Sequence, residues 1–252
     1  MLKGRRILVT GASSGIGREM VRCYAGQGAF VFGVARREAA LAETIAPLPP
    51  GQVSVIAADL TTDPGRRGVA VAVEHAGGTL DVVVHAAGTL GPIGEAAHLD
   101  RYPRDEWYRV FEANLSAVHF LHQRLVPFLS RGDRPATIGI SSGVGRIGRA
   151  GWGMYSISKW ALEGWLEVLA DEWRGRVYSV NPGGTRTPMR AEAIPEEDPS
   201  TLPSPADIAP VFLRLAHSAC PEPSGAKLDA RDFIGTDPWK GITTPASDAP
   251  TP

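Results

Sequence analysis

Short apolar runs alternate with longer amphipathic stretches along the first 183 residues. Runs such as Val82-Val83-Val84 are apolar at successive positions, which is typical of strands buried on both faces of a parallel sheet. Right-handed crossovers place helices on both sides of such a sheet, so the pattern predicts an α/β fold with a doubly wound parallel β-sheet. It predicts strands over residues 7–10, 30–35, 53–57, 81–85, 137–141 and 177–180, and helices over 14–27, 37–46, 69–75, 105–129 and 155–174.

The alternation weakens after Thr187, where acids and prolines occupy residues 189–205. A short helix over 208–217 and a last strand over 226–229 are still expected. Because no shift in composition divides the chain, we expect one domain over residues 1–240. The tail over 241–252 has the composition of a flexible end.

Composition and charge exclude several classes of protein. The 252 residues carry 26 Lys and Arg against 27 Asp and Glu, so the chain lacks the positive charge that binding to nucleic acid or an anionic membrane demands. The first apolar run, Ile7 to Val9, is too short for a signal peptide, and no later run approaches a membrane span. Cys23 and Cys220 lie in no metal-binding motif. We therefore expect a cytoplasmic protein with no metal, membrane or nucleic-acid partner, and with both cysteines in the core.

A glycine-rich turn, TGASSGIG over residues 10–17, follows the first predicted strand and precedes the first predicted helix. Glycines let the backbone turn sharply and approach a pyrophosphate, while the helix N-terminus presents unpaired N–H groups to an anion. The turn therefore predicts a dinucleotide site in a Rossmann-like fold. Its expected contacts are Gly11, Ser13, Ser14, Gly15, Ile16 and Gly17.

Further motifs follow in order, and with them the sequence resembles the short-chain dehydrogenase/reductase (SDR) family. The motifs are Asp59-Leu60, His85-Ala86-Ala87-Gly88, Asn114, Ser142, Tyr155-Ser-Ile-Ser-Lys159 and Asn181-Pro-Gly-Gly-Thr-Arg-Thr187. Two segments depart from the family. His85 and Ala86 replace amide side chains that brace the central sheet, and residues 224–233 lack the usual Asp-Gly-Gly ending.

Tyr155 and Lys159 lie four residues apart on a predicted helix, so they share one face. A phenol with a pKa of ~10 is a poor acid–base catalyst at neutral pH. An ammonium ~4 Å away supplies about 4 kcal/mol at an effective dielectric constant of about 20, enough to lower that pKa by roughly two to three units. We expect Tyr155 to be the general acid or base and Lys159 to lower its pKa.

Ser142 follows the fifth strand, where its hydroxyl can donate to a substrate carbonyl oxygen as negative charge develops. Strand alternation lets only one of Ser141 and Ser142 face the pocket, and the family's spacing to the tyrosine favours Ser142. The resemblance also implies that Asn114 holds a water molecule that relays protons to Lys159.

The end of the second strand indicates which dinucleotide is bound. Ala35 stands where an NAD enzyme carries an acid for the ribose hydroxyls, and the Arg36 guanidinium can bind a 2′-phosphate. NADP(H) is therefore the expected cofactor. The other contacts that the resemblance implies are Asp59, Leu60, Ala87, Gly88, Tyr155, Lys159, Pro182, Gly183, Thr185 and Thr187.

These residues favour an NADP(H)-dependent oxidoreductase that interconverts a ketone or aldehyde and an alcohol by hydride transfer, in the direction of reduction. A 3-oxoacyl thioester reductase and a non-catalytic dinucleotide sensor are the alternatives. The complete set of Ser142, Tyr155 and Lys159 argues against a sensor, which has no need of an acidified tyrosine. The substrate pocket is expected among the loops 90–94, 144–152 and 188–195.

Two hypotheses concern partners. Large apolar residues on the helices over 105–129 and 155–174 predict a homodimer or a homotetramer, because aromatic residues are enriched in interfaces. Those residues are Trp107, Phe111, Leu115, Trp160, Trp165 and Leu169. Arginines in two loops form either a site for an anionic substrate or a solvated surface. They are Arg146, Arg149, Arg186 and Arg190.

Overall fold

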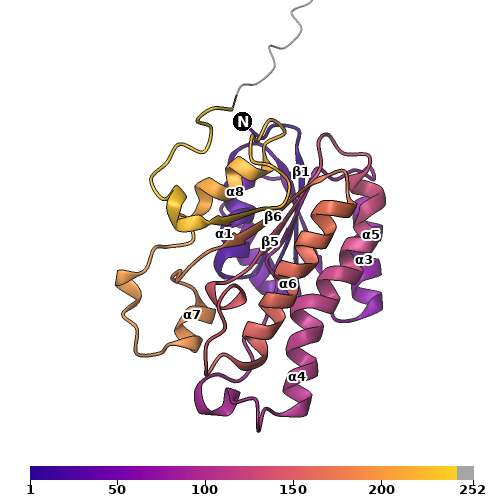
Figure 1. The fold of residues 1–252 in the computed structure, drawn as a ribbon. Coiled ribbons are helices and arrows are strands. Elements are labelled where there is room, and N and C mark those ends of the chain that lie inside the picture. The colour runs from indigo at the N-terminus through magenta and orange to yellow at the C-terminus, as the bar shows by residue number, and fades with distance from the viewer. Residues whose placement is uncertain (243–252) are drawn as a thin grey trace, which may run out of the picture.

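Seven parallel strands form one sheet in the computed structural model, which describes residues 1–242 (Figure 1). The strand order is β3-β2-β1-β4-β5-β6-β7. The strands are β1 (Arg6–Thr10), β2 (Phe30–Ala35), β3 (Val53–Ala57), β4 (Val82–His85), β5 (Ala136–Ile140), β6 (Arg176–Asn181) and β7 (Ala226–Asp229). The chain order reverses between β1 and β4, and ligands of such sheets bind at the carboxyl ends of the strands at this point. The tail expected over 241–252 lies, from residue 243 on, outside the described residues.

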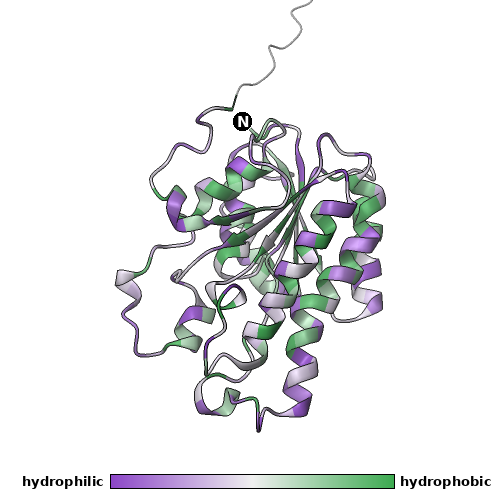
Figure 2. Ribbon diagram, in the orientation of Figure 1, coloured by the Kyte–Doolittle hydropathy of each residue, from purple (hydrophilic) through white to green (hydrophobic). Residues whose placement is uncertain are grey.

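Helices cover both faces of the sheet (Figure 1). They are α1 (Gly15–Gly26), α2 (Glu38–Ile45), α3 (Asp63–His75), α4 (Arg104–Phe111), α5 (Ala117–Leu129), α6 (Gly153–Glu172), α7 (Pro188–Ala193) and α8 (Ala209–Ala216). Ile7 and Val9 of β1 pack in the core cluster that includes α1 and α8, whereas Leu8 packs in the cluster that includes α3 and α5. Alternate residues of one strand thus enter opposite cores, and Figure 2 shows the apolar residues gathered between the two helical layers. The predicted doubly wound fold is confirmed.

Three helices differ from the prediction. Helix α3 begins at Asp63 and not at residue 69, and Thr62 caps it by accepting a hydrogen bond from the backbone N–H of Gly65. The helix predicted over 105–129 is two helices, α4 and α5, joined by a π-helical turn over Glu112–Ser116. Helix α7 was not predicted; its cap is Thr187, which accepts from the N–H of Arg190.

Both cysteines are free, and Cys220 is buried while Cys23 is half-buried. Within residues 1–242, no helix is long and apolar enough to cross a membrane. No group of three or more His, Cys, Asp or Glu side chains in the same part of the chain is arranged to hold a metal ion.

Candidate active site

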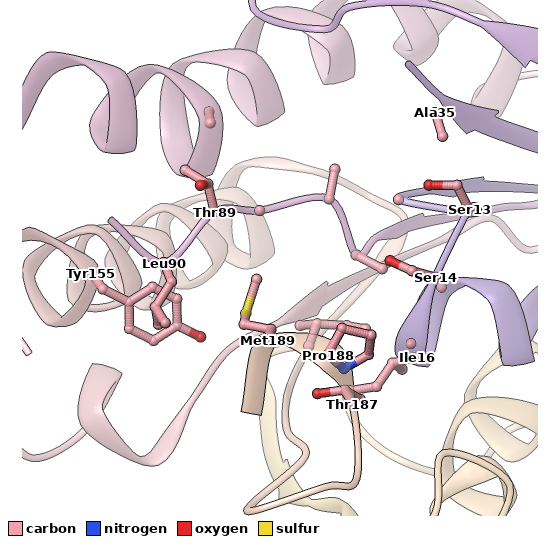
Figure 3. Close-up of a pocket in the computed structure, with 18 of the residues that line it drawn as sticks. Ser13, Ser14, Ile16, Ala35, Thr89, Leu90, Tyr155, Thr187, Pro188 and Met189 are labelled. Carbon is pink, nitrogen blue, oxygen red and sulfur yellow. The ribbon is translucent and has the colours of Figure 1, made fainter. Parts of the chain in front are cut away.

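A cleft of about 570 Å³ lies at the carboxyl edge of the sheet. Figure 3 places Ser13 and Ala35 at one end of it and Tyr155 and Leu90 at the other. Every residue predicted for the site lines this cleft except Asn114. Segments far apart in the sequence therefore converge on one groove.

The glycine-rich turn forms one wall of the cleft between β1 and α1. Gly11 has a positive φ of 70°, and a Cβ on Gly17 would lie 2.4 Å from the carbonyl oxygen of Gly11. Only glycine fits at these two positions. Ser14 precedes α1 without a side-chain capping bond, so N–H groups of the first turn have no helical partner and are available to an anion.

Thr10 ties this turn to the neighbouring strand. Its Oγ1 accepts hydrogen bonds of 3.0 Å from the N–H groups of both Ala86 and Ala87. The amide side chains that brace the sheet in the family are replaced here by His85 and Ala86, and no motif in the sequence pointed to Thr10. A threonine at the end of β1 thus provides one brace between β1 and the segment after β4.

Ala35, Arg36 and Asp59 stand together at the end of the cleft opposite Tyr155. Hydrogen bonds from Thr61 hold the pKa of Asp59 below its usual value, and the positive charge of Arg36 contributes in the same direction. The Arg36 side chain is exposed and Ala35 is buried. No acid occupies position 35, so nothing there repels a phosphate near Arg36.

Tyr155 and Lys159 both project from α6 into the other end of the cleft, and both are more than nine-tenths buried. Burial raises the pKa of Tyr155 to about 12, while the Ser142 hydroxyl lowers it by hydrogen bonding. Burial lowers the pKa of Lys159 to about 8, opposed by the charge of Glu163.

In the chain by itself the pKa of Tyr155 is raised and not lowered, and the expected effect of Lys159 on the phenol stays a prediction. Lys159 Nζ lies 5.7 Å from the centre of the Tyr155 ring and donates instead to the carbonyl oxygen of Ile140, at 2.8 Å. Desolvation of the phenol therefore outweighs the hydrogen bond with Ser142, and Tyr155 is protonated at neutral pH.

The prediction that only one of Ser141 and Ser142 faces the pocket is wrong, because both line the cleft. Ser142 is half-buried and its hydroxyl lowers the pKa of Tyr155, whereas Ser141 is buried and, within the described residues, its hydroxyl has no hydrogen-bond partner. Both line the cleft, but Ser142 is the one whose hydroxyl reaches the phenol.

Asn114 lies behind the cleft wall in the π-helical turn, and it is only 1% exposed. Its Oδ1 accepts from the N–H of Thr89 at 2.8 Å, and its Nδ2 donates to the carbonyl of Thr89 and the hydroxyl of Ser158, both at 2.9 Å. The side chain therefore fastens the segment after β4 to α6.

The four arginines proposed as an anion site do not converge. Arg146 pairs with Glu163 and Asp229 outside the cleft, and Arg190 lines the cleft but is held by both carboxylate oxygens of Glu197. The other two, Arg149 and Arg186, do not line the cleft. The four side chains therefore do not form one anion site in the cleft, because Arg146 and Arg190 are paired with acids and the other two lie outside it.

Arg109 lines the cleft and was missed by the sequence analysis. It pairs with Glu106 at 2.6 Å and donates to the hydroxyl of Thr89 at 2.9 Å. No local motif in the sequence indicates Arg109 or Thr89, because the hydrogen bond between them joins two segments that are 20 residues apart, α4 and the segment after β4. The apolar wall near Tyr155 includes Leu90, Val144, Trp152, Met189 and Ala193.

A glycine turn at the switch point of a parallel sheet, with a buried Tyr and Lys one helical turn apart at the other end of the cleft, defines a dinucleotide-dependent oxidoreductase. The family model for short chain dehydrogenases matches residues 5–198, and the chain belongs to that family. The predicted family and the oxidoreductase class that it implies are confirmed.

Named relatives support the same assignment. The chain is 40% identical to the uncharacterized oxidoreductase YciK of Escherichia coli over 92% of its length and 93% of the relative's. It is 35% identical to the rhamnolipids biosynthesis 3-oxoacyl-[acyl-carrier-protein] reductase of Pseudomonas aeruginosa, with 80% of each chain covered. A solved short chain dehydrogenase from Shigella flexneri, complexed with NADP, superposes with a TM-score of 0.83 at 39% identity and covers 91% of this chain and 98% of its own.

Proposed function

We propose that this protein is an NADPH-dependent reductase of neutral, largely apolar ketones or aldehydes. The observation that carries the proposal is the buried Tyr155 phenol, with Ser142 and Lys159 beside it, at one end of a cleft whose other end holds a glycine turn. A phenol that is protonated at neutral pH is the proton donor that carbonyl reduction requires.

The cleft fits a nicotinamide dinucleotide carrying a 2′-phosphate. A Cβ on Gly11 or Gly17 would collide with backbone atoms of Ala86 and Gly11, so these glycines allow the tight turn that brings the N-terminus of α1 to the cleft, where a pyrophosphate would bind. Arg36 is exposed beside the cleft with no acid at position 35, and the Shigella relative is described as complexed with NADP. Because this cofactor is a metabolite of the cell interior, we place the protein in the cytoplasm.

The proposed mechanism assigns one task to each polar group at the inner end of the cleft. Bound NADPH would supply the hydride. Ser142 donates a hydrogen bond to the substrate carbonyl oxygen, and Tyr155 delivers the proton to that oxygen as negative charge develops. Lys159 lies at the same end of the cleft, with Nζ 5.7 Å from the centre of the Tyr155 ring, and its positive charge would favour the phenolate that remains once the proton has been transferred. Asn114 acts by holding Thr89 and Ser158 in place, and a relay of protons through it stays a prediction.

The walls of the cleft favour a neutral substrate. Leu90, Trp152 and Met189 present apolar surface beside Tyr155. The guanidinium groups of Arg109 and Arg190 are already neutralised by Glu106 and Glu197. An anionic substrate would have to break these pairs, whereas an apolar carbonyl compound gains free energy from burial against the apolar wall.

A 3-oxoacyl thioester is the second candidate substrate, since the Pseudomonas relative is named a reductase of that kind. The apolar wall suits an acyl chain. The complete proton-donating group again argues against a non-catalytic sensor.

The test of the proposed function is a screen of NADPH oxidation against neutral ketones, aldehydes, 2-oxo acids and 3-oxoacyl thioesters, with NADH in parallel. We expect turnover of neutral apolar carbonyl compounds with NADPH, and kcat/KM at least tenfold lower for 2-oxo acids of the same size. Faster turnover of the anionic compounds would overturn the substrate assignment, and equal use of NADH would overturn the cofactor assignment.

The double variant Ala35→Asp, Arg36→Ala tests the preference for NADPH over NADH. It replaces a phosphate partner by a ribose acceptor and adds repulsion against the phosphate, so preference should move from NADPH toward NADH. Because positions 35 and 36 lie far from Tyr155, kcat with the better cofactor should change little.

We also propose a homodimer or a homotetramer formed through α4, α5 and α6. Trp107, Phe120 and Trp160 are between 38% and 51% exposed, although large apolar side chains gain by leaving water. Three residues predicted for this face, Leu115, Trp165 and Leu169, pack within the chain instead. Light scattering at micromolar concentration should give at least twice the chain mass of 26.8 kDa, and Trp160→Glu should reduce it. A monomer in the unmodified protein would refute the assembly.

A further inference from the structure

Glu163 is a buried acid on the same helix as the catalytic pair. It lies one helical turn beyond Lys159 and two turns beyond Tyr155, and only 4% of its surface is exposed. Residues four apart on a helix share a face, so the three side chains form one row along α6. A charged group almost never occupies such a position without partners that compensate for its lost hydration.

Three segments of the chain supply those partners. Ser179 on β6 donates to Glu163 Oε1 at 2.6 Å, and Arg146 in the loop after β5 donates to the same oxygen at 3.1 Å. Lys227 on β7 lies 3.7 Å from Oε2 and also pairs with Glu167, which is exposed on α6. The carboxylate thus joins α6 to the two strands at one side of the cleft and to the loop that carries Ser142.

Arg146 extends these contacts to the next segment of the cleft. Its Nη1 donates to Asp229 at 3.1 Å, and Asp229 in turn accepts a hydrogen bond from Asn181, the residue before Pro182 and Gly183. The arginine is therefore a connection between the loop after β5 and the loop after β6, both of which line the cleft.

We propose that Glu163 is a positioning residue of the active site, whose buried charge fixes α6 against the loops that carry Ser142 and Pro182 and keeps the Lys159 ammonium charged at the end of β5. This inference rests on the proposed function only for its effect on turnover. The contacts themselves hold for any reaction at this cleft.

The electrostatics of the two groups agree with this geometry. Burial alone would raise the pKa of Glu163, but hydrogen bonds from Ser179 and Arg146 and the positive charge of Arg146 help to outweigh burial and keep that pKa below its usual value. Burial lowers the pKa of Lys159 to about 8, and Glu163 is the charge that opposes this change. The other titratable or charged groups around the row are Tyr155, Arg146, Lys227, Asp229 and Glu167.

The chain contains only four lysines, which makes the charge of Lys159 directly measurable. Protein labelled with ¹³C at lysine Cε should give four titrating NMR signals, and Lys159→Arg identifies the one from Lys159. In Glu163→Gln we expect the midpoint of that signal to fall by about one pH unit, because the negative charge that opposes the desolvation of the ammonium is removed.

Glu167→Gln is the matched control, because it removes the same charge from the next turn of α6 and from the same Lys227. It should leave the Lys159 midpoint within about 0.3 unit, since exposed charges are screened by water and salt. Glu163→Asp keeps the charge but withdraws it by one methylene, so it should lower the midpoint by less than Glu163→Gln does. It also serves as the second variant if Glu163→Gln does not fold. An unchanged midpoint in both Glu163 variants, or an equal fall in Glu167→Gln, would overturn the proposal.

Kinetics separate this inference from the proposed function. In Glu163→Gln we expect the alkaline limb of the kcat profile to move to lower pH together with the Lys159 midpoint, and kcat at pH 8 to fall about fivefold to tenfold. If the midpoint moves but no carbonyl compound is turned over by the unmodified protein, the function fails and the positioning role of Glu163 stands. If turnover is normal and the profile does not move, the positioning role fails alone.

Discussion

Tyr155→Phe is expected to lower kcat at least a hundredfold and to leave the affinity for NADPH within about twofold, because acid–base catalysis by a positioned side chain contributes roughly 10²–10⁴. The substitution removes the proton that the phenol delivers and keeps the ring against Trp152, with centroids 5.9 Å apart. Steady-state rates with a substrate from the screen, and fluorescence titration with NADPH, measure the two quantities separately.

Two variants show whether this loss is specific. Lys159→Ala should impair both kcat and NADPH binding, since the family resemblance implies that this ammonium also reaches the nicotinamide ribose. The control is Tyr178 on β6, which is fully buried and whose hydroxyl donates a hydrogen bond to the carbonyl oxygen of Glu222 at 3.0 Å. Tyr178→Phe removes this hydroxyl. It should reduce stability but not kcat. A Tyr155→Phe protein that retained more than about a hundredth of the rate would remove Tyr155 from the role of proton donor.

The elements that carry the cleft could be predicted because their signals are local. The apolar run of β4 and the glycine turn before α1 depend on residues adjacent in the sequence, and the observed bounds of β1, β2 and β3 agree with the prediction to within one residue. The start of α3 could not be predicted in this way. Glycine and proline disfavour helix in isolation, but Thr62 caps the helix and Val69 and Val73 bury its face.

In the candidate site, too, the residues with local sequence signals could be predicted and those that depend on tertiary contacts could not. Tyr155, Lys159 and Ser142 were placed by spacing and by resemblance, and all three line one cleft. The pairing of Arg146 could not be predicted, because its partners Glu163 and Asp229 follow it by 17 and 83 residues. Where a loop arginine points depends on acids brought near it by the topology, so a charge pattern in sequence does not establish an anion site.

The π-helical turn at Asn114 is a further feature without a local signal. The sequence Glu112–Ser116 has no proline or glycine to interrupt a helix, and the predicted continuous helix was reasonable on propensity. The wider turn coincides with the three hydrogen bonds of Asn114, which require its side chain to reach both Thr89 and Ser158. Tertiary contacts, rather than local preference, therefore account for the interruption.

Two buried histidines pack against each other between β4 and α5. His85 at the end of β4 and His122 on α5 are 2% and 3% exposed, and their ring centroids are 5.8 Å apart. Trp165 packs against both rings, and within the described residues none of their four ring nitrogens has a hydrogen-bond partner. Protonating either ring inside the core would place a positive charge where nothing compensates it.

The free energy of unfolding should therefore fall steeply below pH 6.5. Burial lowers the pKa of His122 to about 4, with a smaller effect of His119, and burial followed by the neighbouring His122 lowers the pKa of His85 well below its usual value. In the unfolded chain both histidines bind a proton near pH 6.5, which the folded chain does not bind until much lower pH. Stability is thus fully present above pH 6.5 and is lost as pH falls, by about 1.4 kcal/mol per pH unit for each histidine.

Urea unfolding at pH 7 and at pH 5 measures this loss. The two histidines together should account for a decrease of about 4 kcal/mol, a large share of the roughly 5–15 kcal/mol typical of a domain. His85→Asn and His122→Leu should each reduce the decrease by about 2 kcal/mol, whatever they do to stability at pH 7, because the difference between the two pH values cancels the cost of repacking. His75→Gln, at an exposed position at the end of α3, should leave the decrease unchanged. An equal decrease in all three variants would show that other groups govern acid unfolding.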